Sequence, residues 1–391
     1  MLATAAARVR PAAAAEPFRI GALNPITGAG SPYGTGIQKT IIFTADEINA
    51  AGGAGGRMIE VFPEDSQTSP EPSVIAAKKL IEVNKVHAIM GTWSSGVTLA
   101  VMPLTDAANV IEMNHSGAVA ISTLDKKDLV YRFSATGERI GRAVAGMIAK
   151  EKLNRIGSMA FNNASGRDLV SGVKSQWEKM GHKLLAEVVY EPNRASYRSE
   201  LQSVLAANPE VIVMGSYLPD TTIIVREARQ LGSTVKFIVP GYAVPPTLAE
   251  TLGNEATNGV MAVDYVSALD SPAYAHFVKR YKEVMGPNAE EDFYASCAYD
   301  MVTCTALAIE AAGGAADNFG IVAKLRTVSN PPGDPVGSFA EGKKLLAAGK
   351  KINYEGASGP LDFDEYGDVN PLFKLSEFQD GKMKFKYMLA L

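Results

Sequence analysis

Two neighbouring serines stand in a short turn where the chain could bind an anion. Ser94 and Ser95 follow the apolar run 87–90 and precede a helical pattern over residues 95–109. A helix N-terminus attracts anions, because its first N–H groups have no partner in the helix and the peptide dipoles point their positive end there. The turn therefore predicts a carboxylate site. The alternative is that either serine only caps the helix.

The sequence lacks the common patterns of catalytic and metal sites. It contains no Gly-x-Ser-x-Gly elbow, no phosphate-binding glycine loop with lysine and no His-Glu-x-x-His, and its four histidines are scattered. The glycines within residues 52–56 end a helical pattern, whereas a dinucleotide-binding loop begins one. We expect a binding protein that is not an enzyme and needs no metal or cofactor.

Length and composition indicate a large protein with more than one core. A chain of 391 residues exceeds what one hydrophobic core usually serves, so two lobes are expected. The net charge of -4 gives no reason to expect nucleic acid or an anionic membrane as partner. No apolar run reaches the roughly 18 residues of a membrane helix, which predicts a soluble protein.

The alanine-rich residues 1–16 are typical of the tail of an export signal. Four alanines before Glu16 suit an A-x-A cleavage site, although Arg8 and Arg10 interrupt the usual order of charged head and apolar core. A strand pattern begins directly afterwards at Phe18, which favours export to the periplasm. The alternative is a disordered leader that carries no targeting signal.

Strand and helix patterns alternate along most of the chain. The expected strands are 18–23, 58–65, 87–90, 110–113, 130–133, 155–161, 184–189, 211–215 and 236–239, and the expected helices are 36–51, 73–84, 95–109, 138–150, 166–180, 198–207 and 220–231. This rhythm predicts α/β lobes with parallel sheets, whose ligands gather beyond the carboxyl ends of the strands. Two further helices, 272–284 and 292–311, have no strand pattern between them and are expected to cover an existing sheet.

Several motifs in order resemble one known family. They are Ile20–Gly36, Ala45–Gly53, Asp65, Ala76–Leu80, Gly91–Thr98, Val225–Gly232 and Ala298–Asp300. From about residue 17 to the end, the chain resembles the leucine/isoleucine/valine-type periplasmic binding proteins. These are extracytoplasmic receptors of ABC importers for branched-chain and related amino acids.

The resemblance implies a type I periplasmic binding protein fold. Two doubly wound αβα lobes would be joined by three crossovers, near residues 132–136, 258–265 and 356–361. Lobe I would comprise residues 17–134 and 265–357, and lobe II residues 135–264 and 358–391. The lobes would close on a small molecule, and a membrane permease would recognise the closed state.

The resemblance also implies where a carboxylate binds. The family places a serine at Ser95, and backbone and hydroxyl groups where this chain has Ser116, Gly117 and Ala118. The usual threonine at the end of that loop is absent, so any hydroxyl must come from Ser116. His115 could add a positive charge or a hydrogen bond, or it could be an ordinary surface residue.

The chain departs from the family at the other end of the ligand. An acidic residue pairs with the ammonium of α-amino acids just after the position of Pro240, but Gly241 and Tyr242 stand here. An unpaired ammonium in a closed cleft would cost several kcal/mol. Either another carboxylate such as Asp220 replaces the acid, or the ligand has no ammonium, which we favour.

Aromatic and amide side chains complete the expected site. Tyr33, Trp93, Tyr217 and Tyr242 fall at strand ends or in loops and could stack on a planar or apolar ligand, although ordinary packing would explain each of them. A family tyrosine is replaced by Ala164-Ser165, which widens the cleft, and Asn163 and Ser165 add polar groups. These changes suit a bulkier, aromatic carboxylate.

Two functions remain compatible with the sequence. One is an exported receptor of an ABC importer that binds a small carboxylate. The other is a cytoplasmic amide or amino-acid sensor built on the same fold.

Overall fold

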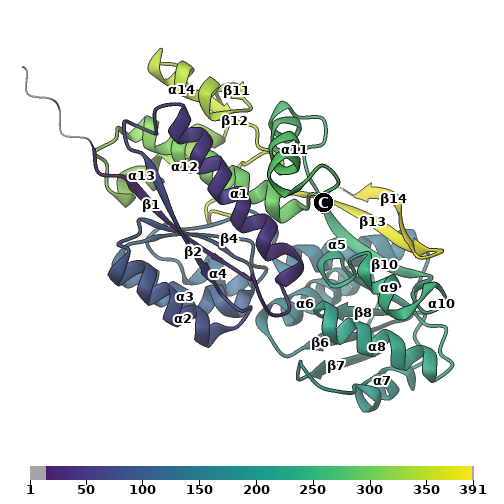
Figure 1. Cartoon of the computed structure of the whole chain (residues 1–391). Helices are drawn as coiled ribbons and strands as arrows, with labels where there is room; N and C mark the ends of the chain where they lie inside the picture. The colour runs from purple at the N-terminus through teal and green to yellow at the C-terminus, as the bar shows by residue number, and fades with distance from the viewer. Residues whose placement is uncertain (1–14, 390–391) are drawn as a thin grey trace, which may run out of the picture.

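Two separate β-sheets divide the chain into two halves (Figure 1). The computed structural model describes residues 15–389. The expected leader at residues 1–16 therefore lies outside the described residues, except for Ala15 and Glu16. We call the parts built on the two sheets the five-stranded half and the seven-stranded half.

The five-stranded half is a parallel sheet with helices on both faces. Its strands are β1 (Phe18–Asn24), β2 (Ile59–Asp65), β3 (Ala88–Thr92), β4 (Ile111–Asn114) and β5 (Val130–Arg132), in the spatial order β2-β1-β3-β4-β5. Helices α1 (Ser31–Ala50), α12 (Phe293–Ala312) and α13 (Asn318–Ser329) pack together on one face, and α2 (Pro70–Lys78) and α3 (Ser95–Ala108) on the other (Figure 1). Further elements complete this half: α4 (Val119–Leu124), α11 (Pro272–Met285), α14 (Phe339–Ala347), and the small sheet of β11 (Asp334–Val336) and β12 (Ile352–Tyr354).

The seven-stranded half is a mixed sheet. Its strands are β6 (Ile156–Phe161), β7 (Ala186–Tyr190), β8 (Val211–Gly215), β9 (Lys236–Pro240), β10 (Val260–Val266), β13 (Leu372–Gln379) and β14 (Lys382–Leu389), in the order β14-β13-β10-β9-β8-β6-β7. The strands from β7 to β10 are parallel, and the hairpin β13-β14 is antiparallel. The helices are α5 (Gly137–Lys150), α6 (Ala164–Lys179), α7 (Arg198–Leu205), α8 (Leu218–Gln230), α9 (Thr247–Leu252) and α10 (Asn254–Thr257).

The predicted α/β alternation is confirmed, with local differences that have steric causes. Helix α1 begins at Ser31, not at residue 36 as expected, and includes two glycines. A Cβ on Gly34 would lie 2.1 Å from the carbonyl oxygen of Pro25, and one on Gly36 would lie 2.7 Å from the Tyr281 hydroxyl. These glycines allow close packing of a helix rather than forming a loop. The helix expected over 73–84 is α2 followed by a π-helical turn, Lys79–Val83.

The connections between the halves lie slightly away from the expected positions. Strand β10 occupies most of the range expected for the second crossover, and it pairs with β13 as far as Val266. The chain therefore leaves this sheet only after Val266. Residues 361–370, expected in the second lobe, pack instead along β5. The Arg132 N–H donates to the Gly367 carbonyl at 2.8 Å, and this contact covers the edge of the five-stranded sheet.

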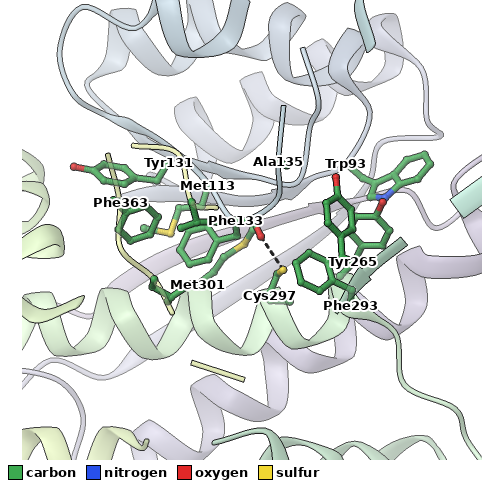
Figure 2. Close-up of a cluster of buried hydrophobic side chains, with 14 of the residues drawn as sticks. Trp93, Met113, Tyr131, Phe133, Ala135, Tyr265, Phe293, Cys297, Met301 and Phe363 are labelled. Carbon is green, nitrogen blue, oxygen red and sulfur yellow. Dashed lines mark hydrogen bonds between the residues drawn. The ribbon is translucent and has the colours of Figure 1, made fainter. Parts of the chain in front are cut away.

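Helix α12 contacts all three connections between the halves. Its Cys297 thiol donates to the carbonyl of Phe133 in the first connection, with sulfur and oxygen 2.9 Å apart (Figure 2). Its Phe293 stacks on Tyr265 at the end of β10, with ring centroids 4.5 Å apart. Its Asp300 accepts hydrogen bonds from Ala357 N and Ser358 N in the third connection, at 2.8 and 2.7 Å. One buried helix thus supports every segment about which the halves could move.

The buried cluster of Figure 2 extends into the space beside β5. The ring of Phe363 packs edge-on against Tyr131 and Phe133, with centroids 5.1 and 5.2 Å apart (Figure 2).

Within residues 15–389, no helix is both long and apolar enough to cross a membrane.

Candidate ligand-binding site

A small cavity lies between the two halves, beyond the carboxyl ends of the strands. Its volume is only about 20 Å³, because aromatic side chains fill most of the space. The lining residues are Trp93, Ser95, His115, Gly117, Ile140, Ser165, Tyr217, Tyr242, Tyr265 and Tyr294. The cavity therefore brings together residues that the sequence placed in separate loops.

Three helix N-termini converge on this cavity. The N-cap residues are Ser94 for α3, Asn163 for α6 and Tyr217 for α8. Each end presents unpaired N–H groups and the positive end of a helix dipole. None of the described lining residues is acidic or basic apart from His115. The arrangement favours an anion that is held by hydrogen-bond donors and dipoles rather than by a counter-charge.

Ser95 is oriented to donate a hydrogen bond into the cavity. Its Oγ accepts hydrogen bonds from Gly117 N at 3.1 Å and Ala118 N at 3.0 Å. Because these two donors occupy the oxygen lone pairs, the hydroxyl proton is available to a ligand. The N-cap Ser94 makes no side-chain capping bond. Its Oγ instead accepts from the Tyr217 hydroxyl at 3.3 Å, across the two halves.

Ser116 cannot serve as the expected replacement for the family threonine. Its hydroxyl lies 2.6 Å from Thr98 Oγ1 and within 3.2 Å of the carbonyl oxygens of Thr92 and Trp93. The side chain is fully buried and its hydrogen-bonding capacity is used inside the five-stranded half. The N–H groups of Gly117 and Ala118, which were expected to donate to a carboxylate, donate instead to Ser95 Oγ.

His115 is buried and is not the surface residue that the sequence allowed. It is 4% exposed, and burial lowers its pKa to about 3, so the imidazole is neutral and supplies no positive charge. Neither ring nitrogen has a hydrogen-bond partner among residues 15–389. The ring lies edge-on to Tyr294, with centroids 5.5 Å apart. A neutral imidazole offers one donor and one acceptor.

Aromatic rings from both halves surround Trp93. Tyr33 stacks on it with centroids 5.8 Å apart, and Tyr217 and Tyr242 of the seven-stranded half lie 5.2 and 5.6 Å away. Tyr294 completes the group at 5.8 Å. All four aromatic residues expected from the sequence are therefore neighbours.

Three cavity residues were missed by the sequence reasoning. Tyr265 ends β10 and Tyr294 begins α12, and Figure 2 shows Tyr265 beside Phe293 at the Trp93 end of the cluster. Ile140 lies in the first turn of α5. The pattern of helix α12 gave no sign that its first turn reaches the cavity, because both faces of that helix are apolar.

The two polar residues expected on α6 have different roles. The Asn163 side chain accepts from Gly166 N at 2.9 Å and caps the helix. Ser165 lines the cavity. A Cβ on Gly117 would lie 3.0 Å from Ser165 Oγ, so this glycine allows the two halves to approach closely.

The Asp264 carboxylate of another strand lies beside Gly241, but it does not line the small cavity. A Cβ on Gly241 would lie 2.5 Å from the carboxyl carbon of Asp264 on β10. Val263, next to Asp264, pairs with Pro240 on the neighbouring strand β9. Asp220, the suggested substitute, accepts hydrogen bonds from the Tyr197 hydroxyl and from Asn193 N, and it does not line the cavity.

Comparisons with known proteins agree with this architecture. An amino acid binding protein from Pseudomonas aeruginosa is 26% identical over 239 residues, which cover 60% of this chain and 63% of that protein. The chain thus aligns with less than two thirds of that relative.

Two solved structures share the fold. A leucine binding protein from Thermotoga maritima has a TM-score of 0.80 at 23% identity, covering 95% of this chain and 99% of that one. A solute-binding protein of an ABC transporter from R. palustris, in complex with 4-hydroxybenzoate, has a TM-score of 0.78 at 19% identity, covering 95% and 97%.

The family expected from the sequence motifs is confirmed. The model of the family described as periplasmic binding protein matches residues 17–370, which is most of the chain. The protein belongs to the periplasmic binding protein family.

Proposed function

We propose that the protein is an exported receptor of an ABC importer, which closes its two halves on a small carboxylate with an aromatic or apolar body. The convergence of the N-termini of α3, α6 and α8 on an uncharged, ring-lined cavity carries this proposal. The helices come from both halves, so an anion between them interacts favourably with both. A ligand that contacts both halves stabilises their closed arrangement.

Named groups can hold each part of such a ligand. The Ser95 hydroxyl and free N–H groups of the first turn of α3 would donate to the carboxylate oxygens. The flat body would lie among Trp93, Tyr217 and Tyr242, replacing contacts that the rings make with one another. His115 has an unused donor and acceptor for a polar substituent.

The uncharged lining favours a carboxylate without an ammonium on the adjacent carbon. No described residue of the small cavity is acidic, so an α-ammonium would lie there without a counter-charge. The R. palustris protein of the same fold, solved with 4-hydroxybenzoate, supports an aromatic carboxylate as ligand class. The four aromatic residues around Trp93 support it as well.

Calorimetric titration of the purified protein tests this proposal. We expect benzoate and 4-hydroxybenzoate to bind more tightly than leucine and valine. Ser95→Ala should weaken carboxylate binding roughly 10- to 100-fold, the effect of losing a hydrogen bond to a charged group. Ser203→Ala, an exposed serine on α7, is the matched control and should leave binding unchanged. Leucine binding as tight as that of the best aromatic carboxylate would contradict the proposed ligand class.

The proposed location needs a separate test. Cells expressing the full reading frame should contain the protein in the periplasmic fraction, shortened at its N-terminus. Retention of the full-length protein in the cytoplasm would contradict the importer receptor and support the cytoplasmic sensor.

A further inference from the structure

A second, larger cavity lies next to the small one and has the opposite chemistry. Its volume is about 770 Å³. Four carboxylates line it, contributed by Asp264 of β10 and by Glu290, Glu291 and Asp292 just before α12. We call this cavity the acidic chamber. Lys374 is the only basic side chain among its described lining residues.

Three of the four carboxylates of the chamber accept hydrogen bonds from neutral donors. Asp264 accepts from Tyr265 N at 2.9 Å, Asp292 from Ala295 N at 3.0 Å, and Glu291 from the Tyr274 hydroxyl at 2.6 Å. Burial raises the pKa of Asp264, an effect that the Lys374 ammonium opposes only in part. Burial also raises the pKa of Asp292 to about 7, and the Asp264 charge adds to this. Lys374 is the one cation among the described lining residues, and a cation bound beside these carboxyl groups would favour their ionised form.

Tyr294 stands at the boundary between the two cavities. It is only 5% exposed. Its side chain lines both cavities. Tyr33, whose ring lies edge-on to Tyr294 at 5.3 Å, also lines the chamber. Aromatic faces beside carboxylates are the usual surroundings of a bound organic cation.

The two cavities share a wall of tyrosines. Tyr242, Tyr265 and Tyr294 line both, whereas Ser95 lines only the small cavity and Asp264 only the chamber. An ammonium on the carbon next to a carboxylate held by Ser95 would remain on the uncharged side of this wall. A cation at the remote end of a longer ligand would reach past the rings to the chamber.

We propose that the acidic chamber is a subsite for a protonated amine, carried at the end of the ligand remote from its carboxylate. This inference rests on the proposed function, because the carboxylate anchor at Ser95 sets which end enters the chamber. Asp264 and Asp292 would pair with the ammonium, and Tyr33 and Tyr294 would contact its methylene groups and its charge. Lys374 would oppose it.

Matched ligands and variants test the subsite by calorimetric titration. The ligand pairs are 4-(aminomethyl)benzoate with 4-methylbenzoate, and 6-aminohexanoate with hexanoate, so that each pair differs in its amine-bearing end. For at least one of the two pairs, the unmodified protein should bind the ligand with the amine at least about tenfold more tightly than the ligand without it. This is the effect expected for an added charged hydrogen bond. Asp264→Asn and Asp292→Asn should remove this preference while binding of 4-methylbenzoate persists, which also shows that the variants are folded.

Two further variants complete this test. One should increase the preference for the amine, and the other is a control. Lys374→Gln should increase the amine preference, because it removes the one opposing charge among the described residues that line the chamber. Asp46→Asn, at an exposed position of α1, should leave the preference unchanged. Benzylamine alone should bind far more weakly than 4-(aminomethyl)benzoate, because it lacks the anchor.

The possible failures are distinguishable. Equal binding within both ligand pairs, or an amine preference that survives in Asp264→Asn and Asp292→Asn, would overturn the subsite and leave the proposed function standing. Benzylamine binding as tight as that of 4-(aminomethyl)benzoate would show that the amine is not linked to an anchored carboxylate, and would also overturn it. Failure of all four carboxylates to bind would contradict the proposed function and the subsite together.

Discussion

A hydrogen bond from Tyr217 links the two halves directly beside the small cavity. The Tyr217 hydroxyl donates to Ser94 Oγ at 3.3 Å, and its ring lies 5.2 Å from that of Trp93. Burial raises the pKa of Tyr217, so the phenol remains protonated and able to donate. The residue thus combines a contact to the proposed ligand with a contact that holds the halves together.

Tyr217→Phe separates these two contributions. The ring is retained and only the hydrogen bond between the halves is lost, so we expect ligand affinity to fall about three- to tenfold, the usual net effect of one neutral hydrogen bond. Titration with the best carboxylate measures this, and Tyr366→Phe at an exposed position is the control. Unchanged affinity would show that the bond to Ser94 does not contribute to closure.

Residue roles were predictable from the sequence where they depend on local structure. Ser95 was expected at the site from its strand-to-helix turn together with the family resemblance, and it lines the cavity. Ser116 was misjudged because its partner Thr98 lies one helix turn inside another element. Asp264 was not found, since its position beside Gly241 depends on the pairing of β9 with β10, which no local pattern reveals.

Strand β4 contains an acidic residue whose proton affects stability. Glu112 is fully buried on β4, next to the edge strand β5, and accepts hydrogen bonds from Thr105 at 2.8 Å and Thr92 at 3.4 Å. Burial raises its pKa from the ordinary 4.5 to about 8. The folded protein therefore keeps a proton that the unfolded chain loses above pH 4.5, and this residue makes the fold less stable as pH rises from about 4.5 to 8.

Glu112→Gln should change this pH dependence in a defined direction. The amide has nearly the same shape and does not titrate, so the free energy of unfolding of the variant, relative to the unmodified protein, should rise between pH 5 and pH 8. A gain of about 3 to 5 kcal/mol follows from the conversion of a pKa shift into free energy. Denaturant titrations at both pH values measure it. A relative stability that does not change with pH would mean that Glu112 is already ionised in the folded protein.

Elements with strong periodicity were predicted well, and those that depend on tertiary contacts were not. The parallel strands such as β8 are short apolar runs between helices and were located to within a few residues. Strand β10, the hairpin β13-β14 and helices α13 and α14 were not recognised as regular elements. The hairpin lies at an open edge of the sheet, where Phe385 and Met388 are exposed, so its pattern of burial is weak.

The two halves of the molecule are linked by three connections and by direct contacts between helices. All three connections contact the buried helix α12, and the halves meet directly at α4 and α6. There the Asp168 carboxylate of α6 accepts from Val119 N at the start of α4, at 2.8 Å. This bond holds α4 and α6 together next to residues 116–118, and neither Asp168 nor Val119 lines the cavity.

Asp168→Ala should therefore favour an open arrangement. The loss of a charged acceptor for Val119 N should weaken ligand binding by roughly tenfold, because part of the binding free energy would be used for closure. Small-angle X-ray scattering of the unliganded variant should give a larger radius of gyration than the unmodified protein. Glu178→Ala, on the exposed side of the same helix, is the control. Identical scattering and affinity would show that this contact does not hold the halves together.

At this scale the sequence indicated the two sheets and the three connections, but not their exact limits. Residues 361–370 were expected in the second lobe because the family pattern places them there. In the structure they pack on β5, where Phe363 fills a space between Tyr131 and Phe133. Which half these residues pack on depends on how well their side chains fit each surface, and local sequence periodicity does not predict this.

The positions of the two tryptophans give the protein a built-in spectroscopic signal. Trp93 contacts Tyr217 and Tyr242 from the opposite half, whereas Trp177 is 1% exposed and stacks on His182 within its own half. Separation of the halves would expose the indole of Trp93 to water and leave that of Trp177 unchanged. Intrinsic fluorescence, recorded in a Trp177→Phe background, would then follow opening and closing in real time without any attached dye.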